Sequence, residues 1–371
     1  MAENAALHGA KLAKNDEFYT QYSDIEAEMN AYVEYNPDVF RGKTILCPCD
    51  DPEWSNFTRY FATNFTRFGL KKLISTSYLK SAGSRQLSLF EENSPVFDEE
   101  KHEKRGKLYI LEREADGVVR VDVDDIKLDR YLDEDGDFRS DEVKAFREEA
   151  DMIITNPPFS LFREFLKWII EADKEFIIMG NKNAITYKEV FPLLKSNQMW
   201  VGYTSLNGGR WMILPKGIEI QSNKAREDGR GNMILNVPGV CWFTNLDHGK
   251  RHEPLLLDTM AHNLKFNRRL REKFLKEYGK AEYPHYDNYD AIEVPFVECI
   301  PSDYDGVMGV PITFLDKYNP DQFEILGASD NGAVDDKYKL PHFKVHNEPY
   351  VDGKKTYKRL FVQPKKGGRD A

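Results

Sequence analysis

Short apolar runs alternate with amphipathic stretches through the first half of the chain. Runs typical of buried strands lie, in chain order, at Lys43–Cys49, Lys72–Tyr78, Asp151–Thr155 and Glu175–Met179. Apolar residues at steps of three and four predict helices between Leu12 and Tyr35 and at Trp54–Phe68, Asp141–Glu149 and Leu161–Ile170. Apolar strand runs that are separated by helices predict a parallel α/β sheet with both faces covered.

This pattern is interrupted at two places. Residues 80–107 are polar and end in a charged run, so an exposed insertion is expected there, followed by a hairpin with strands at Leu108–Glu112 and Val118–Val123. After about residue 195, short β-like runs are followed by a basic helical stretch at 263–280. We therefore expect one domain at 1–195, and a region at 196–371 that contains the end of the first sheet and a second part.

Charge is distributed unevenly along the 371 residues. The net charge is −10, and residues 91–150 carry all of this excess with 21 acids and 11 bases, whereas the tail from residue 334 has a net charge of +5. A polyanionic partner is therefore not excluded, because phosphate binding depends on the cations at the contact and not on the sum.

The four cysteines predict buried thiols in a reducing cytoplasm, with no disulfide framework and no metal site. We expect no secretory signal, because the N-terminal segment has no apolar core. We also expect no membrane helix, because no apolar stretch approaches the ~18 residues that one needs.

The most informative motif is Asn156-Pro157-Pro158-Phe159, which directly follows the strand run Asp151–Thr155. The Asn156 side-chain oxygen and the Pro157 carbonyl can accept both hydrogens of a conjugated amino or amide nitrogen, which favours an sp³-like nitrogen that a methyl donor can reach. The two prolines fix the backbone angle φ and so keep the acceptors in place. Phe159 offers a face on which a flipped-out base can stack. The alternative is a turn that merely ends a strand.

With this motif the chain resembles the EcoRI methyltransferase family of S-adenosylmethionine-dependent adenine-N6 DNA methyltransferases. The matching pieces are Asp16–Thr20, Cys49–Pro52 with Ser55–Phe57, Gly136–Ser140, Asn156–Phe162, Thr244–His248 and Gly309–Glu324. The resemblance implies a Rossmann-like class I methyltransferase sheet, a C-terminal mixed α/β target-recognition region and S-adenosyl-L-methionine as the cosubstrate.

The turn after the first strand is a candidate cofactor site. Asp50 and Asp51 stand between a strand and a helix N-terminus, where carboxylates suit the ammonium of a methionine-type ligand. Helix capping is the alternative, and the two roles can coexist. The resemblance further implies that Tyr19 and Thr20 close over the methionine end, with an ordinary helix start as the alternative.

The residues expected to bind the adenine of the cofactor lie further along the chain. The resemblance implies that Asp137 accepts from its amine and that Phe138 stacks on its ring, with a solvated turn as the alternative. Two features depart from such folds: Ser75–Tyr78 contains no acid to bind the ribose, and the turn after the first strand has no glycine. The ribose-binding residue is therefore not assigned.

The C-terminal region is expected to recognise duplex DNA. Arg268, Arg269 and Arg271 suit phosphate contacts, and Tyr286, Tyr289 and Tyr304 suit phosphate and base contacts. Ordinary surface charge is the alternative for each residue. The resemblance suggests a short palindromic target, but its sequence is not predicted.

Two other function classes stay open at this point. A protein glutamine-N5 methyltransferase shares an Asn-Pro-Pro-aromatic motif, although the C-terminal extension and the N-terminal cofactor motif favour DNA. A catalytically inactive DNA-binding protein is the other, although the complete motif at Asn156–Phe159 favours an enzyme. We expect a cytoplasmic monomer from a restriction–modification system, or an orphan or phage modification enzyme.

The insertion contains one further motif. Gln86-Leu87-Ser88-Leu89-Phe90 resembles the pentapeptide by which bacterial replication and repair proteins bind the sliding clamp. Leu89 and Phe90 would be the apolar anchors of such a linear motif. The alternative is that these side chains pin the insertion onto the core.

Overall fold

The computed structural model describes residues 18–52, 55–79, 94–113, 126–214, 225–329, 336–340 and 348–365. The chain forms two compact units, Met1–Lys182 with Gly202–Asp247, and Asn183–Val201 with His248–Ala371. The polypeptide therefore passes between the units three times, and residues 202–247, which lie beyond the expected boundary at 195, belong to the first unit. No helix in the described ranges is long and apolar enough to span a membrane.

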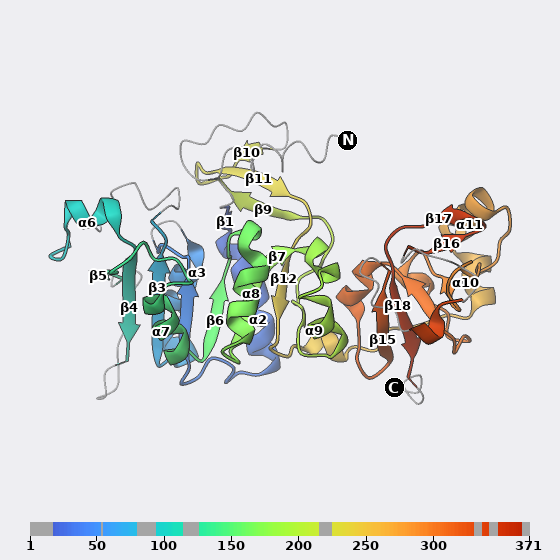
Figure 1. Ribbon diagram of the computed structural model, residues 1–371, viewed down its shortest axis with the longest axis horizontal. Helices are drawn as coiled ribbons and strands as arrows, with labels where there is room; N and C mark the ends of the chain where they lie inside the picture. The colour runs from blue at the N-terminus through green and yellow to red at the C-terminus, as the bar shows by residue number, and fades with distance from the viewer. Residues whose placement is uncertain are drawn as a thin grey trace. The chain divides into compact units, whose positions relative to one another are not determined.

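A large mixed sheet forms the centre of the first unit (Figure 1). The strands that this unit contributes to it are, in spatial order, β5 (Leu128–Tyr131), β4 (Lys107–Glu112), β3 (Lys72–Ser77), β2 (Thr44–Pro48), β6 (Met152–Thr155), β7 (Glu175–Asn181) and β12 (Val240–Thr244). The four central strands β3, β2, β6 and β7 are parallel to one another, as expected. β4, β5 and β12 are antiparallel to their neighbours, so the sheet is mixed, and the prediction of a parallel sheet holds for its centre but not for its edges.

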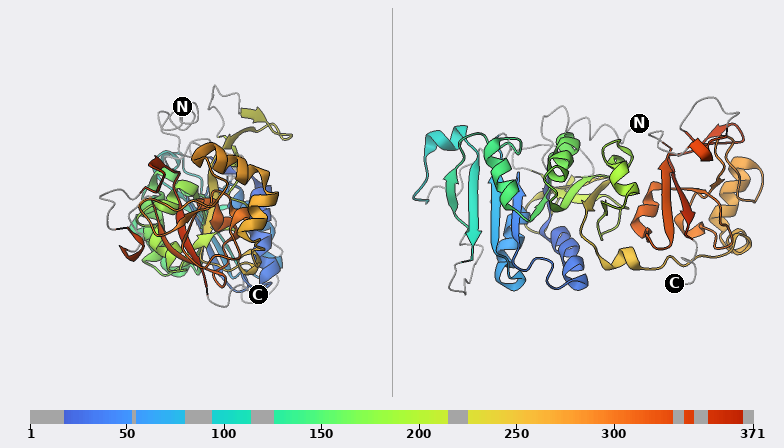
Figure 2. Two further views of the ribbon diagram at one scale, coloured as in Figure 1. Left: turned by 90° about the vertical axis from the view of Figure 1, so that its right-hand side faces the viewer. Right: turned by 60° about the horizontal axis from the view of Figure 1, so that its bottom comes forward.

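Helices cover both faces of this sheet (Figures 1 and 2). One face carries α2 (Tyr22–Tyr35), α3 (Asn56–Thr63) and α4 (Phe65–Phe68), and the other carries α7 (Asp141–Glu149) and α8 (Phe162–Ile170). The helix predicted at Trp54–Phe68 is interrupted, because the Asn64 side chain donates to Tyr60 O over 2.9 Å at the end of α3. Gly69, in the left-handed conformation, ends α4.

The described part of the expected insertion is not only loop. It contains α6 (Glu99–Lys104), and β4 begins at Lys107, whose side chain is buried. In the large sheet β4 lies between β3 and β5, whereas the expected hairpin strand Val118–Val123 lies outside the described residues.

A second, antiparallel sheet of the first unit holds the N-terminal segment. Its order is β1 (Tyr19–Thr20), β9 (Arg210–Ile213), β11 (Met233–Val237) and β10 (Ala225–Glu227). Tyr19 pairs with Ile213 and Thr20 with Met212. This pairing holds Tyr19 and Thr20 in an extended segment.

The second unit contains helices and a four-stranded sheet. The helices are α9 (Phe191–Lys195), α10 (Met260–Phe266) and α11 (Arg268–Tyr278), and the sheet order is β13 (Ile292–Glu293), β14 (Met308–Val310), β18 (Leu360–Pro364) and β15 (Phe323–Ala328). Short strands β8 (Trp200–Val201), β16 (Tyr350–Val351) and β17 (Lys354–Lys355) complete the unit. In the part of the chain that the structure describes, the 3₁₀ helices are η2 (Phe159–Leu161), η3 (Lys182–Thr186), η4 (Gly249–His252), η5 (Val297–Cys299), η6 (Ile312–Lys317) and η7 (Asp336–Tyr338).

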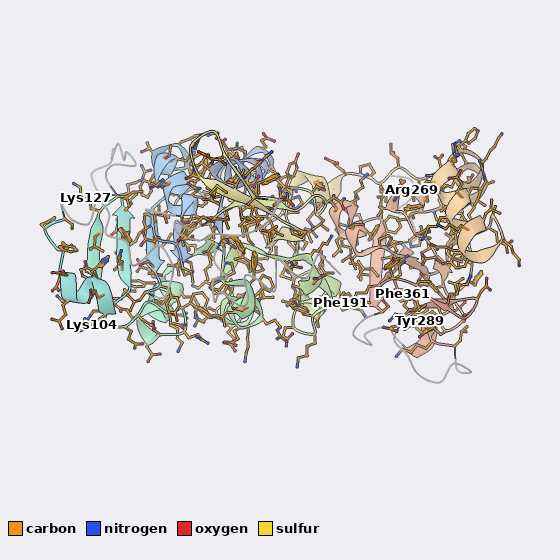
Figure 3. The ribbon with its side chains drawn as sticks, turned by 90° about the horizontal axis from the view of Figure 1, so that it is seen from above. Lys104, Lys127, Phe191, Arg269, Tyr289 and Phe361 are labelled. Atoms are coloured by element: carbon orange, nitrogen blue, oxygen red, sulfur yellow. The ribbon has the colours of Figure 1, made fainter. Side chains whose placement is uncertain are left out.

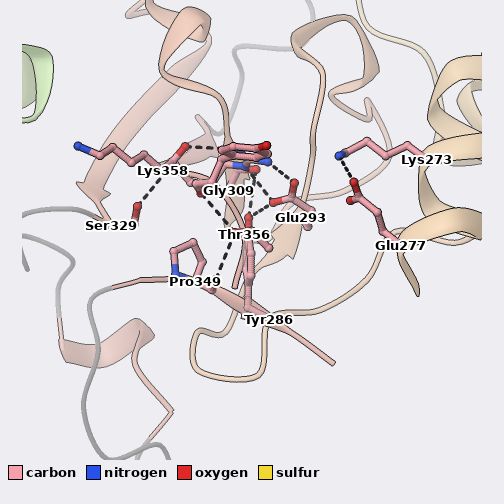
Figure 4. Close-up of polar contacts among 11 residues, drawn as sticks. Lys273, Glu277, Tyr286, Glu293, Gly309, Ser329, Pro349, Thr356 and Lys358 are labelled. Atoms are coloured by element: carbon pink, nitrogen blue, oxygen red, sulfur yellow. Dashed lines mark hydrogen bonds and ion pairs between the residues drawn. The ribbon is translucent and has the colours of Figure 1, made fainter. Parts of the chain in front are cut away.

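Two tyrosines expected at the DNA surface lie in the core of this unit. Tyr289 is 2% exposed, and its ring lies 4.5 Å from the ring of Phe361 (Figure 3). Tyr286 is also buried, and its hydroxyl donates to the Glu293 carboxylate, which pairs with Arg359 (Figure 4). The expectation that Tyr286 and Tyr289 contact DNA is therefore wrong: their rings fill the core, and the Tyr286 hydroxyl satisfies a buried carboxylate.

Candidate active site

A cleft lies at the edge of the large sheet where the parallel strands β2 and β6 end. Residues that follow neighbouring parallel strands meet at one edge, which is where open α/β sheets bind ligands. The cleft is lined by Phe18, Tyr19, Thr20, Cys49, Asp50, Asp51, Ser55, Phe57, Asn156, Pro157 and Pro158. Three segments that are far apart in the sequence, each with predicted site residues, therefore line one cleft.

The Asn156 side chain has a defined orientation. Its Nδ2 donates to Phe18 O over 2.6 Å, and its Oδ1 is buried with no hydrogen-bond donor among the described residues. A buried acceptor without a partner costs roughly 1–3 kcal/mol, so a donor that a ligand supplies would be bound favourably. Pro157 and Pro158 line the cleft, whereas Phe159, at the start of η2, packs half-buried against the core.

Asp50 connects the ends of the two strands. Its Oδ2 lies 2.7 Å from Thr155 Oγ1, the last residue of β6, and its Oδ1 accepts from the Ser55 hydroxyl. Ser55 also caps α3, since its Oγ accepts from Phe57 N. Burial and the nearby Asp50 raise the pKa of the Cys47 thiol well above its usual range, so Cys47 is a protonated core residue and not a nucleophile.

Asp51 forms a buried ion pair. Its Oδ2 lies 3.5 Å from Lys107 Nζ, with side-chain exposures of 4% and 1%. Asp51 O also accepts from Ser55 N over 2.7 Å, at the turn into α3. The capping alternative is thus present in the backbone at Asp51 and in the Ser55 side chain, while both carboxylates line the cleft.

The backbone at Cys49 is unusual. Its φ is +65°, in the left-handed region that favours glycine. The glycine that the sequence lacks in this turn is therefore replaced by a cysteine held in a strained conformation, which is a frequent property of ligand-binding turns.

The N-terminal segment is fastened to the cleft at three points. Phe18 O accepts from Asn156, Thr20 O accepts from Asn56 Nδ2 over 2.7 Å, and Thr20 Oγ1 donates to Met179 Sδ over 2.9 Å. These bonds join β1 to β6, to α3 and to β7, so Tyr19 and Thr20 border the cleft.

Asp137 and Phe138 are in different environments. The Asp137 carboxylate accepts from Arg139 Nη2 over 2.7 Å and from Arg139 N over 2.9 Å, in a turn that follows β5. Phe138 is 2% exposed, and its ring packs edge-on against Phe165 and Trp168 of α8. The core packing thus accounts for Phe138, and stacking on a cofactor ring stays a prediction.

The three arginines of the second unit differ from one another. The Arg268 side chain is 81% exposed and pairs with Glu272, one turn further along α11. Arg269 lies over the ring of Phe296 at 4.1 Å (Figure 3), and Arg271 donates to Leu264 O and Lys265 O at the end of α10. Of the three, only Arg268 combines a highly exposed side chain with a single surface ion pair. Such a pair contributes little to stability, so a DNA phosphate can readily replace Glu272 as the partner of Arg268.

Sequence reasoning missed Thr155, Lys107 and Asn56 as residues of this site. Thr155 ends an apolar strand run, where a threonine is ordinary, and Lys107 precedes a strand within a highly charged segment. Their roles depend on cross-strand neighbours, which periodicity does not report. Asn56, next to Ser55, was part of the family motif but had no role assigned.

The cleft residues fit a ligand that combines a methionine part with a nucleoside. Asp50 and Asp51 can accept from its ammonium and hydroxyl groups, and the buried Asn156 Oδ1 needs a donor. Among the described residues, no cluster of His, Cys, Asp and Glu could hold a metal ion.

Comparison with known proteins places the chain in one family. The profile described as adenine-specific methyltransferase EcoRI matches residues 6–365. The type II methyltransferase M.EcoRI of Escherichia coli is 41% identical over 98% of both chains, and M.MpnI of Mycoplasma pneumoniae is 33% identical over 95% of this chain and 96% of its own. No solved structure matches the chain significantly. With a profile match over nearly its whole length, the chain belongs to the EcoRI family of adenine-specific methyltransferases.

Proposed function

We propose that the protein transfers a methyl group from S-adenosyl-L-methionine to N6 of a flipped-out adenine in duplex DNA, on a Rossmann-like class I methyltransferase sheet. The observation that carries the proposal is the buried Asn156 Oδ1, which is held by the bond from Nδ2 to Phe18 O beside two carboxylates. The family membership supports DNA adenine over a protein glutamine as the target, and methylation over simple DNA binding.

In this proposal Asn156 Oδ1 and Pro157 O accept the two N6 hydrogens of the target adenine. These bonds draw the nitrogen toward sp³ geometry and direct its lone pair into the cleft. The cosubstrate supplies an electrophilic methyl group when it is bound. The new carbon–nitrogen bond forms as the carbon–sulfur bond breaks, and one N6 proton then leaves to water. Phe159 would offer its ring to the adenine, which requires it to leave part of its packing.

The cofactor assignments remain proposals with unequal support. Tyr19, Thr20, Asp50 and Asp51 all line the cleft, which supports their role in binding the cosubstrate. Asp137 follows β5, and Gly136 beside it contacts the end of β3 so closely that a Cβ would lie 2.1 Å from Ser77 O. This contact supports a place for Asp137 at the same edge of the sheet.

Duplex DNA is the proposed partner of the second unit. Arg268, with its highly exposed side chain, is the best supported phosphate contact. Arg269 is also exposed and lies over Phe296, whereas Arg271 is partly buried and donates to two carbonyls of α10. The family and the relatives named above support a restriction–modification role, and an orphan enzyme remains the alternative.

The deciding experiment offers labelled S-adenosylmethionine and either duplex DNA or bulk protein to the purified chain. We expect label in N6-methyladenine of the DNA. Label in protein glutamine would replace the proposal by the protein methyltransferase. DNA binding without any transfer would make the chain an inactive binder. Sequencing DNA from an expressing host would then reveal the target.

The sliding-clamp motif Gln86–Phe90 lies outside the described residues, so this partner stays a proposal, as does the monomeric state. A peptide spanning Ser84–Glu92 should bind purified clamp in the micromolar range, and a control peptide with Leu89→Ala and Phe90→Ala should not. Tethering of this kind would raise the concentration of the enzyme near newly copied DNA. Absence of binding by the unaltered peptide would end this proposal.

A further inference from the structure

Two neighbouring carboxylates line the cleft, but their partners come from opposite sides. Asp50 is bonded to Thr155, which ends β6 and immediately precedes Asn156. Asp51 pairs with Lys107, which begins β4. In the sheet order β4-β3-β2-β6, these two partners lie on opposite sides of β2.

This arrangement separates two ends of the cleft. The methyl group has to reach the nitrogen beside Asn156, so the methyl end, with the methionine part, belongs near β6 and Asp50. The nucleoside then extends along the sheet edge toward β3 and β4. Asp51 lines the cleft and pairs with Lys107 on that side of β2, where the sequence has no acid in Ser75–Tyr78 to bind a sugar.

The residues at the second end share one face of the sheet. Ser77 and Lys107 are directly opposite in the antiparallel register of β3 and β4, and opposed residues direct their side chains to the same face. Ser75, two residues earlier on β3, accepts from the Thr58 hydroxyl of α3 over 2.8 Å and donates to Asp50 O, so this face of β3 is the one that α3 covers. Asp51 lies in the turn that leads into α3, so it reaches Lys107 from the same side.

The chemistry of this cluster suits sugar hydroxyls. The Asp51 charge is matched by Lys107, so its carboxylate can accept from neutral donors without needing a ligand cation. The ammonium can donate to a hydroxyl oxygen, and Ser77 Oγ is buried at 1% residue exposure with no partner among the described residues. A diol, whose groups both donate and accept, fits acceptor, donor and hydroxyl together.

We infer that the Asp51 carboxylate, positioned by Lys107 and assisted by the Ser77 hydroxyl, binds the ribose hydroxyls of the methyl donor, while Asp50 serves the methionine end. This inference rests on the proposed function, since it names the subsite of the same cosubstrate. Lys107 acts mainly by orienting the Asp51 carboxylate, so it is a positioning residue.

The test measures recognition of a single ligand hydroxyl by the full-length protein. Calorimetric titrations compare 5′-methylthioadenosine with its 2′-deoxy counterpart, and S-adenosylhomocysteine serves as the complete ligand. We expect the wild type to bind the ribose form at least about tenfold more tightly than the deoxy form. Lys107→Met and Asp51→Asn should each bring the two affinities to within about twofold.

Two matched variants separate the subsite from general damage. Asp50→Asn should weaken S-adenosylhomocysteine yet keep the discrimination between ribose and deoxyribose. Lys104→Met, on α6 with a side chain that is 65% exposed (Figure 3), should change neither. Because Lys107→Met can impair folding, thermal unfolding of every variant is measured first, and Asp51→Asn, which preserves shape, tests the same coupling.

The outcomes distinguish this inference from the proposed function. Discrimination that persists in Lys107→Met or Asp51→Asn overturns the ribose subsite, and so does a wild type that binds S-adenosylhomocysteine without discriminating the two nucleosides. A wild type that binds neither S-adenosylhomocysteine nor 5′-methylthioadenosine refutes the proposed function itself.

Discussion

Asn156 Nδ2 donates to the carbonyl oxygen of Phe18, and this bond of 2.6 Å joins the end of β6 to a segment 138 residues earlier. The bond decides which way the amide faces, because only the nitrogen can donate to a carbonyl. The oxygen is therefore the atom that is left for a ligand. The same bond holds the N-terminal segment at the cleft.

Replacing Asn156 by Ala should remove the oxygen that accepts from the target amine and the bond to Phe18 O that orients this oxygen. We expect turnover to fall by about 10²-fold or more, by analogy with the loss of one preorganised polar group, while duplex binding persists. Single-turnover methylation and a DNA-binding titration measure the two effects. Asn207→Ala, at an exposed position, is the control. Near-normal turnover of Asn156→Ala would remove Asn156 from the catalytic assignment.

Arg268 and Arg271 should respond differently to replacement by Ala. Arg268→Ala should flatten the dependence of DNA affinity on salt and leave stability nearly unchanged, because its ion pair with Glu272 is exposed. Arg271→Ala should lower the free energy of unfolding by about 1 kcal/mol, because it loses bonds to two carbonyls at the end of α10. Salt titrations and urea unfolding of both variants measure these effects. If the salt dependence of DNA affinity is unaltered in Arg268→Ala, the phosphate contacts lie on another surface of the protein.

Glu28 of α2 should make stability depend on pH. The side chain is fully buried and accepts from Tyr203 N over 2.6 Å and from Thr204 N over 2.8 Å, and burial raises its pKa above the ordinary value of 4.5. An acid with a raised pKa holds its proton more tightly in the folded state. Its contribution is therefore complete below the unfolded value and is lost as pH rises through the folded value.

Glu28→Gln cannot ionise, so it provides the reference for this effect. We expect the free energy of unfolding of the wild type, relative to Glu28→Gln, to decrease as pH rises above the ordinary carboxyl value of 4.5. Urea unfolding of both proteins below and above this value measures the difference, and exposed Glu99→Gln is the control. A difference that is independent of pH would argue against a raised pKa for Glu28.

Cys49 should tolerate glycine better than a branched residue. A left-handed conformation costs an ordinary side chain roughly 1–2 kcal/mol, and a β-branched side chain is the least compatible with it. We expect Cys49→Val to lower the free energy of unfolding by about 1–2 kcal/mol relative to Cys49→Gly. Chemical unfolding compares the two variants, and equal stability would show that the turn relaxes its φ.

The sequence predicts well the four central strands and the position of the Asn156 motif at the end of a strand, because both are local patterns. Apolar runs report strands that are buried on both faces, and the Asn156 motif is contiguous. The antiparallel edge strands and the pair of Asp51 with Lys107 are not predictable in this way. Periodicity states which residues are buried but not which strand lies next to which.

The misplaced tyrosines illustrate the same limit. Tyr286 and Tyr289 stand in a polar segment, Tyr283–Asp290, without regular apolar spacing, which is typical of surface loops. Tyr286 is accommodated by Gly309, where a Cβ would lie 2.1 Å from its hydroxyl, and its partner Glu293 pairs with Arg359 far along the chain, while Tyr289 packs on Phe361. Only the tertiary structure brings these partners together.

The repeated passage of the chain between its units limits how the second unit can be exchanged among relatives. A fragment that ends at residue 195 lacks β12, so the large sheet would have β7 as an unpaired edge, and an open edge of this kind promotes aggregation. A graft that joins at residue 248 keeps this sheet whole but leaves residues 183–201 of the old second unit in place. Exchange of the whole second unit therefore needs three matched junctions, and relatives that recombine at a single point inherit a hybrid of the two parents.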